Sequence, residues 1–411
     1  MAFQTVNRWL VLLSAIVINI CVGSAYAWSV YQKPLIELFG WPTSEASLAF
    51  TISLCVLPVA MVIAGKIQDQ KGPGKVIFTG GTIFGLGMIG AGFTNSLSVL
   101  YCTYGVLGGF GIGAVYACTI ANTVKFFPDK RGLASGLVVA GFGCGAVVVA
   151  PVSSALIEAY GILSTFKILG VTYLITISVC VLFVRTAPAE YRPPGWIPPV
   201  QANTAVVGVD KNWRQMLADP SFYILWLIFT LGATCGLMII GHASPIGQEM
   251  IQLSPKNAAM VVSVLALANM AGRIFWGIVS DYVGRYRAMT IILLLSSLML
   301  CTLSTVSSLW PFLAVIVVIG LCFGGVTGTF PSITADAFGA KNLGMNYGVI
   351  STGYGVAAFV GPRLASYFKG MTQGDYTQAF YIAAAMGVVG AGFAVVMQVK
   401  VKIKADRGRV V

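Results

Sequence analysis

Charged side chains are scarce in this sequence. Only 9% of its 411 residues are Asp, Glu, Lys or Arg, whereas 57% are hydrophobic. So little charge cannot cover the surface of two or three soluble domains, which excludes that organisation. The mean hydropathy is +0.86. Because a membrane-spanning helix needs about 20 apolar residues, this composition predicts a polytopic membrane protein with about a dozen such helices.

Residue types that commonly carry chemistry are also scarce. The sequence has one histidine, 13 acidic residues and no Walker sequence, metal-ligand cluster or nucleophile triad. Its nine cysteines lie inside or at the edge of apolar runs, without the spacing of a metal site, and are interpreted as small core or lipid-facing residues. We therefore expect no cofactor, no metal site, and neither a membrane enzyme nor a primary pump.

Apolar runs divided by Gly, Pro and charged residues predict twelve spanning helices, and hence an all-α membrane protein with two pseudo-symmetric six-helix bundles. The runs cover residues 9–31, 46–65, 76–94, 98–124, 132–157, 165–184, 221–245, 257–280, 288–306, 309–334, 343–368 and 377–399. A proline-rich polar stretch separates the sixth run from the seventh. The predicted organisation is an N-terminal bundle over 1–185, a cytoplasmic linker over 186–219, a C-terminal bundle over 220–400 and a basic tail over 401–411.

The first run has a second interpretation, as a signal peptide. Arg8 precedes it, and Ala25-Tyr26-Ala27 resembles a cleavage site. The run is longer than a signal core, however, and its removal would leave eleven spans and break the symmetry of two halves. We therefore expect the first helix to be retained.

The 25 Lys and Arg residues lie mainly on one side of the predicted membrane. Nineteen lie on the side of the N-terminus, four lie on the opposite side and two lie within helices. Because positive residues concentrate in cytoplasmic loops, both termini and the linker are predicted to be cytoplasmic, in the cell (inner) membrane. Topology thus explains the net charge of +12, and we expect a lipid bilayer rather than nucleic acid as partner.

The two halves of the chain contain a repeat at an offset of about 212 residues. Gly65, Asp69 and Gly72 follow the second predicted helix, as Gly277, Asp281 and Gly284 follow the eighth, so that both loops read Gly-x3-Asp-x2-Gly. A second block pairs Phe127, Lys130, Gly136, Gly141, Phe142 and Gly143 with Phe338, Lys341, Gly348, Gly353, Tyr354 and Gly355. Glycine-rich loops of this kind are otherwise simple tight turns, but two copies in register indicate a duplicated bundle.

The duplicated loops, twelve spans and central linker resemble the major facilitator superfamily over essentially the whole chain. The resemblance implies two halves that rock about a midplane substrate site, giving alternating access, in a protein that we expect to be a monomer. It also implies a cytoplasmic gate. The predicted gate residues are the loop carboxylates Asp69 and Asp281, favoured at helix N-termini, and the nearby cations Lys130, Arg131 and Arg285.

Arg273 is the strongest candidate for a binding residue. It lies about sixteen residues into the helix that begins near Asn257, roughly 24 Å along it and not far past the midplane. None of the 13 acidic residues is predicted at that depth, and an arginine there is costly unless it faces water or an anion. We predict that Arg273 binds a carboxylate in bidentate fashion in a water-filled cavity, with Asn269 as an added amide donor. The alternative is an arginine that snorkels or bonds helix-end carbonyls. The other intrahelical cation, Arg363, is interpreted as an interfacial anchor.

A closer resemblance is carried by the stretch from Asn269 to Arg287, by Asn7-Arg8-Trp9, by residues 127–136 and by Asn346-Tyr347-Gly348. These motifs are similar to the oxalate/formate antiporter family and, more distantly, to the monocarboxylate transporters. The oxalate carrier pairs the helix 8 arginine, here Arg273, with a helix 11 lysine, and this chain has Tyr354 at that position. One cation instead of two implies a substrate with one carboxylate, with Tyr354 supplying a hydroxyl donor and an apolar ring.

Proton coupling needs a titratable group. Monocarboxylate transporters have an acidic residue one turn before the arginine, where this chain has Asn269, and an amide cannot titrate. His242, the sole histidine, is the candidate proton site, and a plain interhelical hydrogen bond is its structural alternative. On the N-terminal side, Tyr26, Tyr116 and Phe142 are predicted to line the cavity, although aromatic residues at such spacing also serve packing.

The sequence thus predicts a secondary transporter of a small monocarboxylate, L-lactate or pyruvate, that is coupled to a proton. An oxalate/formate-type organic anion exchanger is the alternative in the same class. A non-transporting membrane sensor or receptor on the same scaffold is the alternative from another class.

Overall fold

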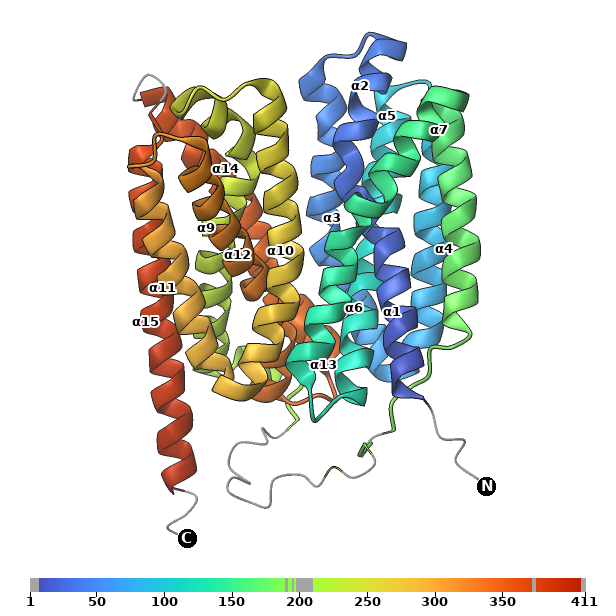
Figure 1. Ribbon diagram of the computed structural model, residues 1–411. Helices are drawn as coiled ribbons and strands as arrows, with labels where there is room; N and C mark the ends of the chain where they lie inside the picture. Colours follow the sequence, from blue (N-terminus) through green and yellow to red (C-terminus); the bar gives the residue numbers. More distant parts are fainter. Residues whose placement is uncertain (1–6, 189–190, 194–195, 197–209, 372–374, 408–411) are drawn as a thin grey trace. The chain divides into compact units, whose positions relative to one another are not determined.

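The computed structural model describes residues 7–188, 191–193, 196, 210–371 and 375–407. These residues form helices and connecting segments without a strand (Figure 1). The helices are α1 (Arg8–Gly23), η1 (Ser24–Ala27), α2 (Trp28–Phe39), α3 (Thr43–Lys71), α4 (Pro73–Ala91), α5 (Leu97–Leu100), η2 (Tyr101–Gly108), α6 (Gly109–Phe126), α7 (Arg131–Val181), α8 (Trp213–Leu217), α9 (Pro220–Met250), α10 (Pro255–Val283), α11 (Arg285–Leu303), α12 (Leu309–Phe338), α13 (Leu343–Ile350), α14 (Thr352–Met371) and α15 (Thr377–Arg407).

The predicted apolar runs all lie on these helices. Ten helical segments in the described part of the chain are long and apolar enough to cross a membrane. One of them is α7, which carries two of the predicted runs and bends at Gly161, where φ is +76°. The run predicted at 343–368 is divided between α13 and α14 by a turn at Ser351. The all-helical membrane architecture expected from the sequence is therefore confirmed.

The chain folds into two compact units that exchange short segments. Unit 1 comprises residues 1–128, 138–195 and 340–349, and unit 2 comprises residues 129–137, 196–339 and 350–411. The first residues of α7 thus pack in unit 2, whereas α13 packs in unit 1. Most of the predicted proline-rich linker, at 189–190, 194–195 and 197–209, and the end of the predicted tail, at 408–411, lie outside the described residues. Residues 401–407 continue α15.

In unit 1, the first span is broken near its middle. α1 ends at Gly23, and the 3-10 turn η1 separates it from α2. Glycine is required at position 23, because a Cβ there would lie 2.0 Å from the carbonyl oxygen of Phe142 on α7. One turn earlier, the buried Asn19 amide donates to Thr119 Oγ1 on α6 at 2.7 Å. These two contacts place the end of α1 against both α6 and α7.

In unit 2, a row of glycines on α12 brings this helix against α10. Gly320, Gly324 and Gly328 recur every four residues and so share one helix face. A Cβ on Gly324 would lie 2.1 Å from the carbonyl oxygen of Asn269, and one on Gly328 would lie 2.8 Å from that of Arg273. Small residues permit such close backbone approach between membrane helices. This contact fixes the backbone of the α10 turn that carries Arg273.

Asp219 caps α9 and provides a test of the fold outside the spanning segments. Its carboxylate accepts the Ser221 backbone N–H at 2.8 Å and also binds Lys211. Burial raises the pKa of Asp219, but the hydrogen bonds from Lys211 and Ser221 outweigh burial and lower this pKa to about 2. A depressed carboxyl pKa stabilises the fold above the unfolded value of about 3.9, and this contribution is lost as the pH falls toward 2.

We therefore expect Asp219→Asn to destabilise the protein by about 1 kcal/mol at pH 7, because asparagine can still cap α9 but loses the charge that binds Lys211. Thermal unfolding followed by tryptophan fluorescence should show a lowered Tm that is constant between pH 8 and pH 5. The difference from the wild type should shrink below pH 4. The exposed Asp406 on α15 provides the control Asp406→Asn. An equal Tm for Asp219→Asn and wild type at pH 7 would show that the charge of Asp219 does not stabilise the fold.

Candidate functional site

Arg273 lies on α10 in unit 2, and only 3% of its surface is exposed. Its Nε donates a hydrogen bond to Asn269 Oδ1 at 3.2 Å. The structure therefore brings together the two residues that the sequence placed one turn apart on a single helix face. This bond fixes the orientation of the guanidinium group. The Nη pair is the part of the group that can form a bidentate contact with a carboxylate.

Two other helices hold the Arg273 turn in place. The α12 glycines contact its backbone on one side, and α7 contacts it on another. A Cβ on Gly136 of α7 would lie 2.3 Å from the Arg273 carbonyl oxygen. One turn away, Gly132 and Gly277 meet backbone to backbone, since a Cβ on Gly132 would lie 2.1 Å from the Gly277 carbonyl oxygen. The Arg273 backbone is thus seated against glycines of both α7 and α12.

Tyr354 lies on α14 in an apolar cluster of unit 2. Its ring centroid is 6.2 Å from that of Phe229 on α9, and the cluster includes Phe323 on α12. Phe323 is followed directly by Gly324, which contacts the Asn269 and Arg273 backbone. α12 therefore connects the surroundings of Tyr354 with the α10 turn that carries Arg273. The ring of Tyr354 is half-buried.

Three residues predicted to line the site from the N-terminal side form one aromatic cluster in unit 1. The Tyr26 and Phe142 rings are 5.1 Å apart and nearly perpendicular, and the Tyr116 and Phe142 rings are 4.8 Å apart. They come from η1, α6 and α7. Phe142 is buried at the centre, whereas the two tyrosines are half-buried. The structure thus brings all three residues together around Phe142.

His242 lies near the end of α9. Its Nε2 is 3.0 Å from Ser366 Oγ on α14, and its ring lies 6.2 Å from the ring of Tyr376. A second group of polar side chains surrounds it. Glu249 accepts hydrogen bonds from Lys369 Nζ at 2.6 Å and from the Tyr376 hydroxyl at 3.0 Å. The interhelical hydrogen bond considered as a structural role is therefore present, and it adjoins an ion pair.

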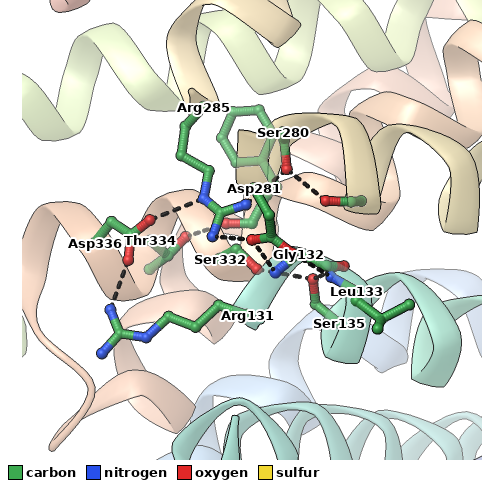
Figure 2. A network of polar contacts seen from close by, with 12 residues as sticks. Arg131, Gly132, Leu133, Ser135, Ser280, Asp281, Arg285, Ser332, Thr334 and Asp336 are labelled. Carbon is green, nitrogen blue, oxygen red and sulfur yellow. Dashed lines mark hydrogen bonds and ion pairs between the residues drawn. The ribbon is translucent and has the colours of Figure 1, made fainter. Parts of the chain in front are cut away.

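The second loop carboxylate, Asp281, belongs to a polar network of unit 2 (Figure 2). It accepts the backbone N–H groups of Gly132 and Leu133, each at 2.9 Å, and thereby caps the start of α7. Arg285 binds Asp281 at 2.7 Å and Asp336 at 2.8 Å. Asp336 also binds Arg131 at 2.5 Å. Asp336 thus joins the predicted gate residues Arg131 and Arg285, and Arg285 in turn binds the predicted carboxylate Asp281.

Asp336 was missed by sequence reasoning. The sequence places it at the cytoplasmic end of a helix as one of several acids, and it has no counterpart in the Gly-x3-Asp-x2-Gly repeat. Only the fold shows that α12 brings it between Arg131 and Arg285. The sequence itself carries no signal that distinguishes Asp336 from the other acids on that side.

The first loop carboxylate forms the matching arrangement in unit 1. Asp69 accepts the backbone N–H of Met345 at 2.9 Å and that of Gly344 at 3.4 Å, at the start of α13. Its cation is Lys125, at 3.2 Å. The lysine that binds Asp69 is therefore Lys125. The predicted gate residue Lys130 is exposed. Each duplicated carboxylate therefore caps a helix from the segment exchanged into its unit.

We expect Asp336→Asn to weaken the unit 2 network, because both arginines lose their shared counter-charge. A hydrogen bond to a charged group contributes about 1.5–3 kcal/mol. The measurement is Tm by tryptophan fluorescence, with Glu158→Gln, an exposed acid, as the control. A Tm lowered by several degrees in Asp336→Asn, with no change in the control, is the expected result. An unchanged Tm in Asp336→Asn would contradict it.

No group of three His, Cys, Asp or Glu side chains within the described residues is placed to hold a metal ion. A buried guanidinium oriented by an amide, as in Arg273 and Asn269, is a group that can bind a carboxylate.

Known proteins are similar to this chain over most of its length. The model of the Major Facilitator Superfamily matches residues 10–273 and 243–409. The chain is 31% identical over 357 residues to the uncharacterized MFS-type transporter YhjX of Escherichia coli, covering 86% of each chain. It is 29% identical to the oxalate:formate antiporter of Oxalobacter formigenes, covering 92% of this chain and 88% of the antiporter. It is 25% identical to monocarboxylate transporter 13 of Rattus norvegicus, covering 93% of this chain and 87% of that transporter.

Solved structures show the same fold. The human organic anion transporter MFSD10 (TETRAN) matches with a TM-score of 0.74 at 14% identity, over 94% of this chain and 99% of that one. The proton:xylose symporter XylE matches with a TM-score of 0.71 at 14% identity, over 95% of this chain and 96% of that one. At these identities the structural likeness concerns the fold alone.

Proposed function

The chain belongs to the Major Facilitator Superfamily, and we propose that it is a secondary transporter of a small monocarboxylate, L-lactate or pyruvate, coupled to a proton. As a member of this family it is a multi-pass membrane transporter and not an enzyme. The proposal concerns its cargo, its coupling and its binding residues. Alternating access about Arg273 is the mechanism that we propose.

The single observation that carries the proposal is the buried guanidinium of Arg273, which is 3% exposed and oriented by Asn269 at 3.2 Å. A guanidinium group recognises a carboxylate through two parallel hydrogen bonds. Close glycine packing by α7 and α12 fixes the backbone that carries it. Such a preorganised donor pair lowers the cost of binding a small anion.

We infer the size and the charge of the cargo from the side chain at position 354. This position offers a phenol within an apolar cluster instead of a second cation. A second carboxylate on the substrate would have to be buried there without a counter-charge, which is costly. A methyl group and one further oxygen, as in lactate or pyruvate, match the ring and the hydroxyl. Tyr26, Tyr116 and Phe142 are proposed to contact the substrate from the N-terminal side.

The relatives support a small organic anion as cargo. One relative is named an oxalate:formate antiporter and another a monocarboxylate transporter. For coupling, Asn269 is an amide and cannot carry a proton, so we propose His242 as the proton site. His242 contacts Ser366 and lies near the ion pair between Glu249 and Lys369, so that a proton on its ring would change the charge of a polar group of side chains.

We further propose that the helix-capping carboxylates form the cytoplasmic gate, with Asp69 at one latch and Asp281 at the other. Lys130, Arg131 and Arg285 are the proposed cations of the gate, to which the structure adds Lys125 and Asp336. The charge distribution supports a location in the cell (inner) membrane with both termini in the cytoplasm, and we propose that the protein is a monomer.

Uptake of labelled L-lactate into proteoliposomes under an imposed pH gradient tests this function. An inwardly directed proton gradient should drive lactate accumulation, and an uncoupler should abolish it. The 29% identity to the oxalate:formate antiporter favours organic anion exchange as the second candidate. Uptake that ignores pH but requires internal formate or oxalate would establish exchange instead. The absence of any flux with all these anions would contradict both candidates.

A further inference from the structure

A pocket of about 910 Å³ opens on unit 2 between α9 and α14. His242, Gln248 and Glu249 line it from α9, and Ser366 and Lys369 line it from α14. Gln252, just after α9, completes the wall with φ at +54°, a left-handed conformation that is uncommon outside glycine. Strained backbone of this kind concentrates at functional sites. We propose that this α9–α14 pocket is a second binding site for the carboxylate anion, occupied when His242 is protonated.

The charges in the pocket explain the need for a proton. Lys369 is matched by Glu249 at 2.6 Å, and the Tyr376 hydroxyl also donates to Glu249. These three residues are the charged and titratable groups that face His242 from α9, α14 and the segment before α15 in the described chain. With a neutral imidazole their charges cancel, and the pocket does not attract an anion. With an imidazolium the pocket carries one positive charge, which matches a monocarboxylate.

The hydrogen bond of His242 provides the donor for the anion. A protonated imidazole donates from both ring nitrogens, and its Nε2 lies 3.0 Å from Ser366 Oγ. Ser366 Oγ then accepts a hydrogen bond from His242 Nε2, so that the hydroxyl hydrogen of Ser366 can be donated to a carboxylate in the pocket. One proton on His242 therefore supplies both the charge and the donor. The positive-charge count assigns this end of α9 to the outer side, where the pocket would bind proton and substrate together.

This inference rests on the proposed function, since it takes the same anion as ligand. The test is saturation-transfer NMR with L-lactate on the purified full chain at pH 5.5 and pH 8.0. The Arg273→Ala background removes the proposed central site. In that background we expect lactate to bind at least tenfold more tightly at pH 5.5 than at pH 8.0. His242→Gln, which keeps a hydrogen-bonding side chain without the charge, should abolish that pH dependence.

Two further variants complete the design. Ser366→Ala should weaken the acid-dependent binding but leave its pH dependence, because His242 still titrates. Arg363→Gln is the matched control, because Arg363 lies on the same helix over the ring of Phe359 and outside the pocket. It should leave lactate binding unchanged. A matching Tm in each variant and the wild type confirms that the variants fold.

The outcomes for the pocket and for the proposed function are distinguishable. If Arg273→Ala shows no acid-strengthened binding, or if that binding survives in Arg273→Ala combined with His242→Gln, the pocket is not an anion site. If wild type and Arg273→Ala bind lactate identically at pH 8.0, the central site of the proposed function fails instead. The first result leaves Arg273 as the anchor, and the second leaves the pocket in place.

Discussion

Arg273→Ala should abolish L-lactate transport and strongly weaken lactate binding at pH 8.0. The guanidinium is buried, Asn269 orients it, and the α7 and α12 glycines fix its backbone. Truncating one partner of a buried, hydrogen-bonded charge pair costs about 2–5 kcal/mol, and about 1.4 kcal/mol corresponds to a tenfold change. We therefore expect the affinity for lactate at pH 8.0 to fall by about 100-fold or more, as measured by binding to the purified protein.

Arg273→Lys separates geometry from charge. A lysine keeps the positive charge but lacks the planar fork, so that lactate binding should be weakened and not lost. Arg363→Ala controls for the removal of an arginine from a helix of the same unit, and it should bind lactate like the wild type. Wild-type affinity in Arg273→Ala at pH 8.0 would refute the role of Arg273 as the anchor.

Gly136→Val should lower both lactate affinity and flux by about tenfold or more. A Cβ at this position would lie 2.3 Å from the Arg273 carbonyl oxygen, so that the valine must push α7 away from α10 or displace the Arg273 turn. Overpacking of this kind costs about 1–3 kcal/mol. The start of α7 is also held by the Asp281 cap, and its displacement would strain the network of Figure 2. Lactate binding and proteoliposome uptake are the measurements.

Gly392→Val is the matched control, because a Cβ at Gly392 on α15 would meet no atom within 4 Å. Gly136→Ala gives a graded test with a smaller insertion, and its effect should lie between those of the wild type and Gly136→Val. A normal Tm for Gly136→Ala, combined with lowered lactate affinity, would separate the positioning of Arg273 from a general loss of folding. Wild-type affinity in both Gly136 variants would show that this contact does not position the arginine.

The helices were predictable because lipid imposes a simple rule on length and polarity. Every apolar run found in the sequence lies on a helix, since backbone groups in a membrane must bond within the segment. The interruptions were not predictable. η1 separates α1 from α2, and the residue before it, Gly23, meets Phe142, which lies more than a hundred positions away. A glycine in an apolar run does not itself show which neighbour it meets.

The site was predictable where it depends on local spacing. Asn269 and Arg273 are one turn apart on a helix, and the hydrogen bond between them follows from that spacing. The duplicated Asp69 and Asp281 also carry their signal in the sequence. Asp336 could not be predicted in this way, because its two arginines lie 205 and 51 residues away and meet it only through packing. The exchange of residues 129–137 and 340–349 between the units also depends on packing over long separations.

The central claim is that Arg273 binds the carboxylate of the cargo, and a structure of the protein determined with L-lactate tests it most directly. We predict that both carboxylate oxygens lie about 2.8 Å from guanidinium nitrogens of Arg273, with the methyl group toward the ring of Tyr354. Lactate density elsewhere, with no carboxylate on Arg273, would contradict the account.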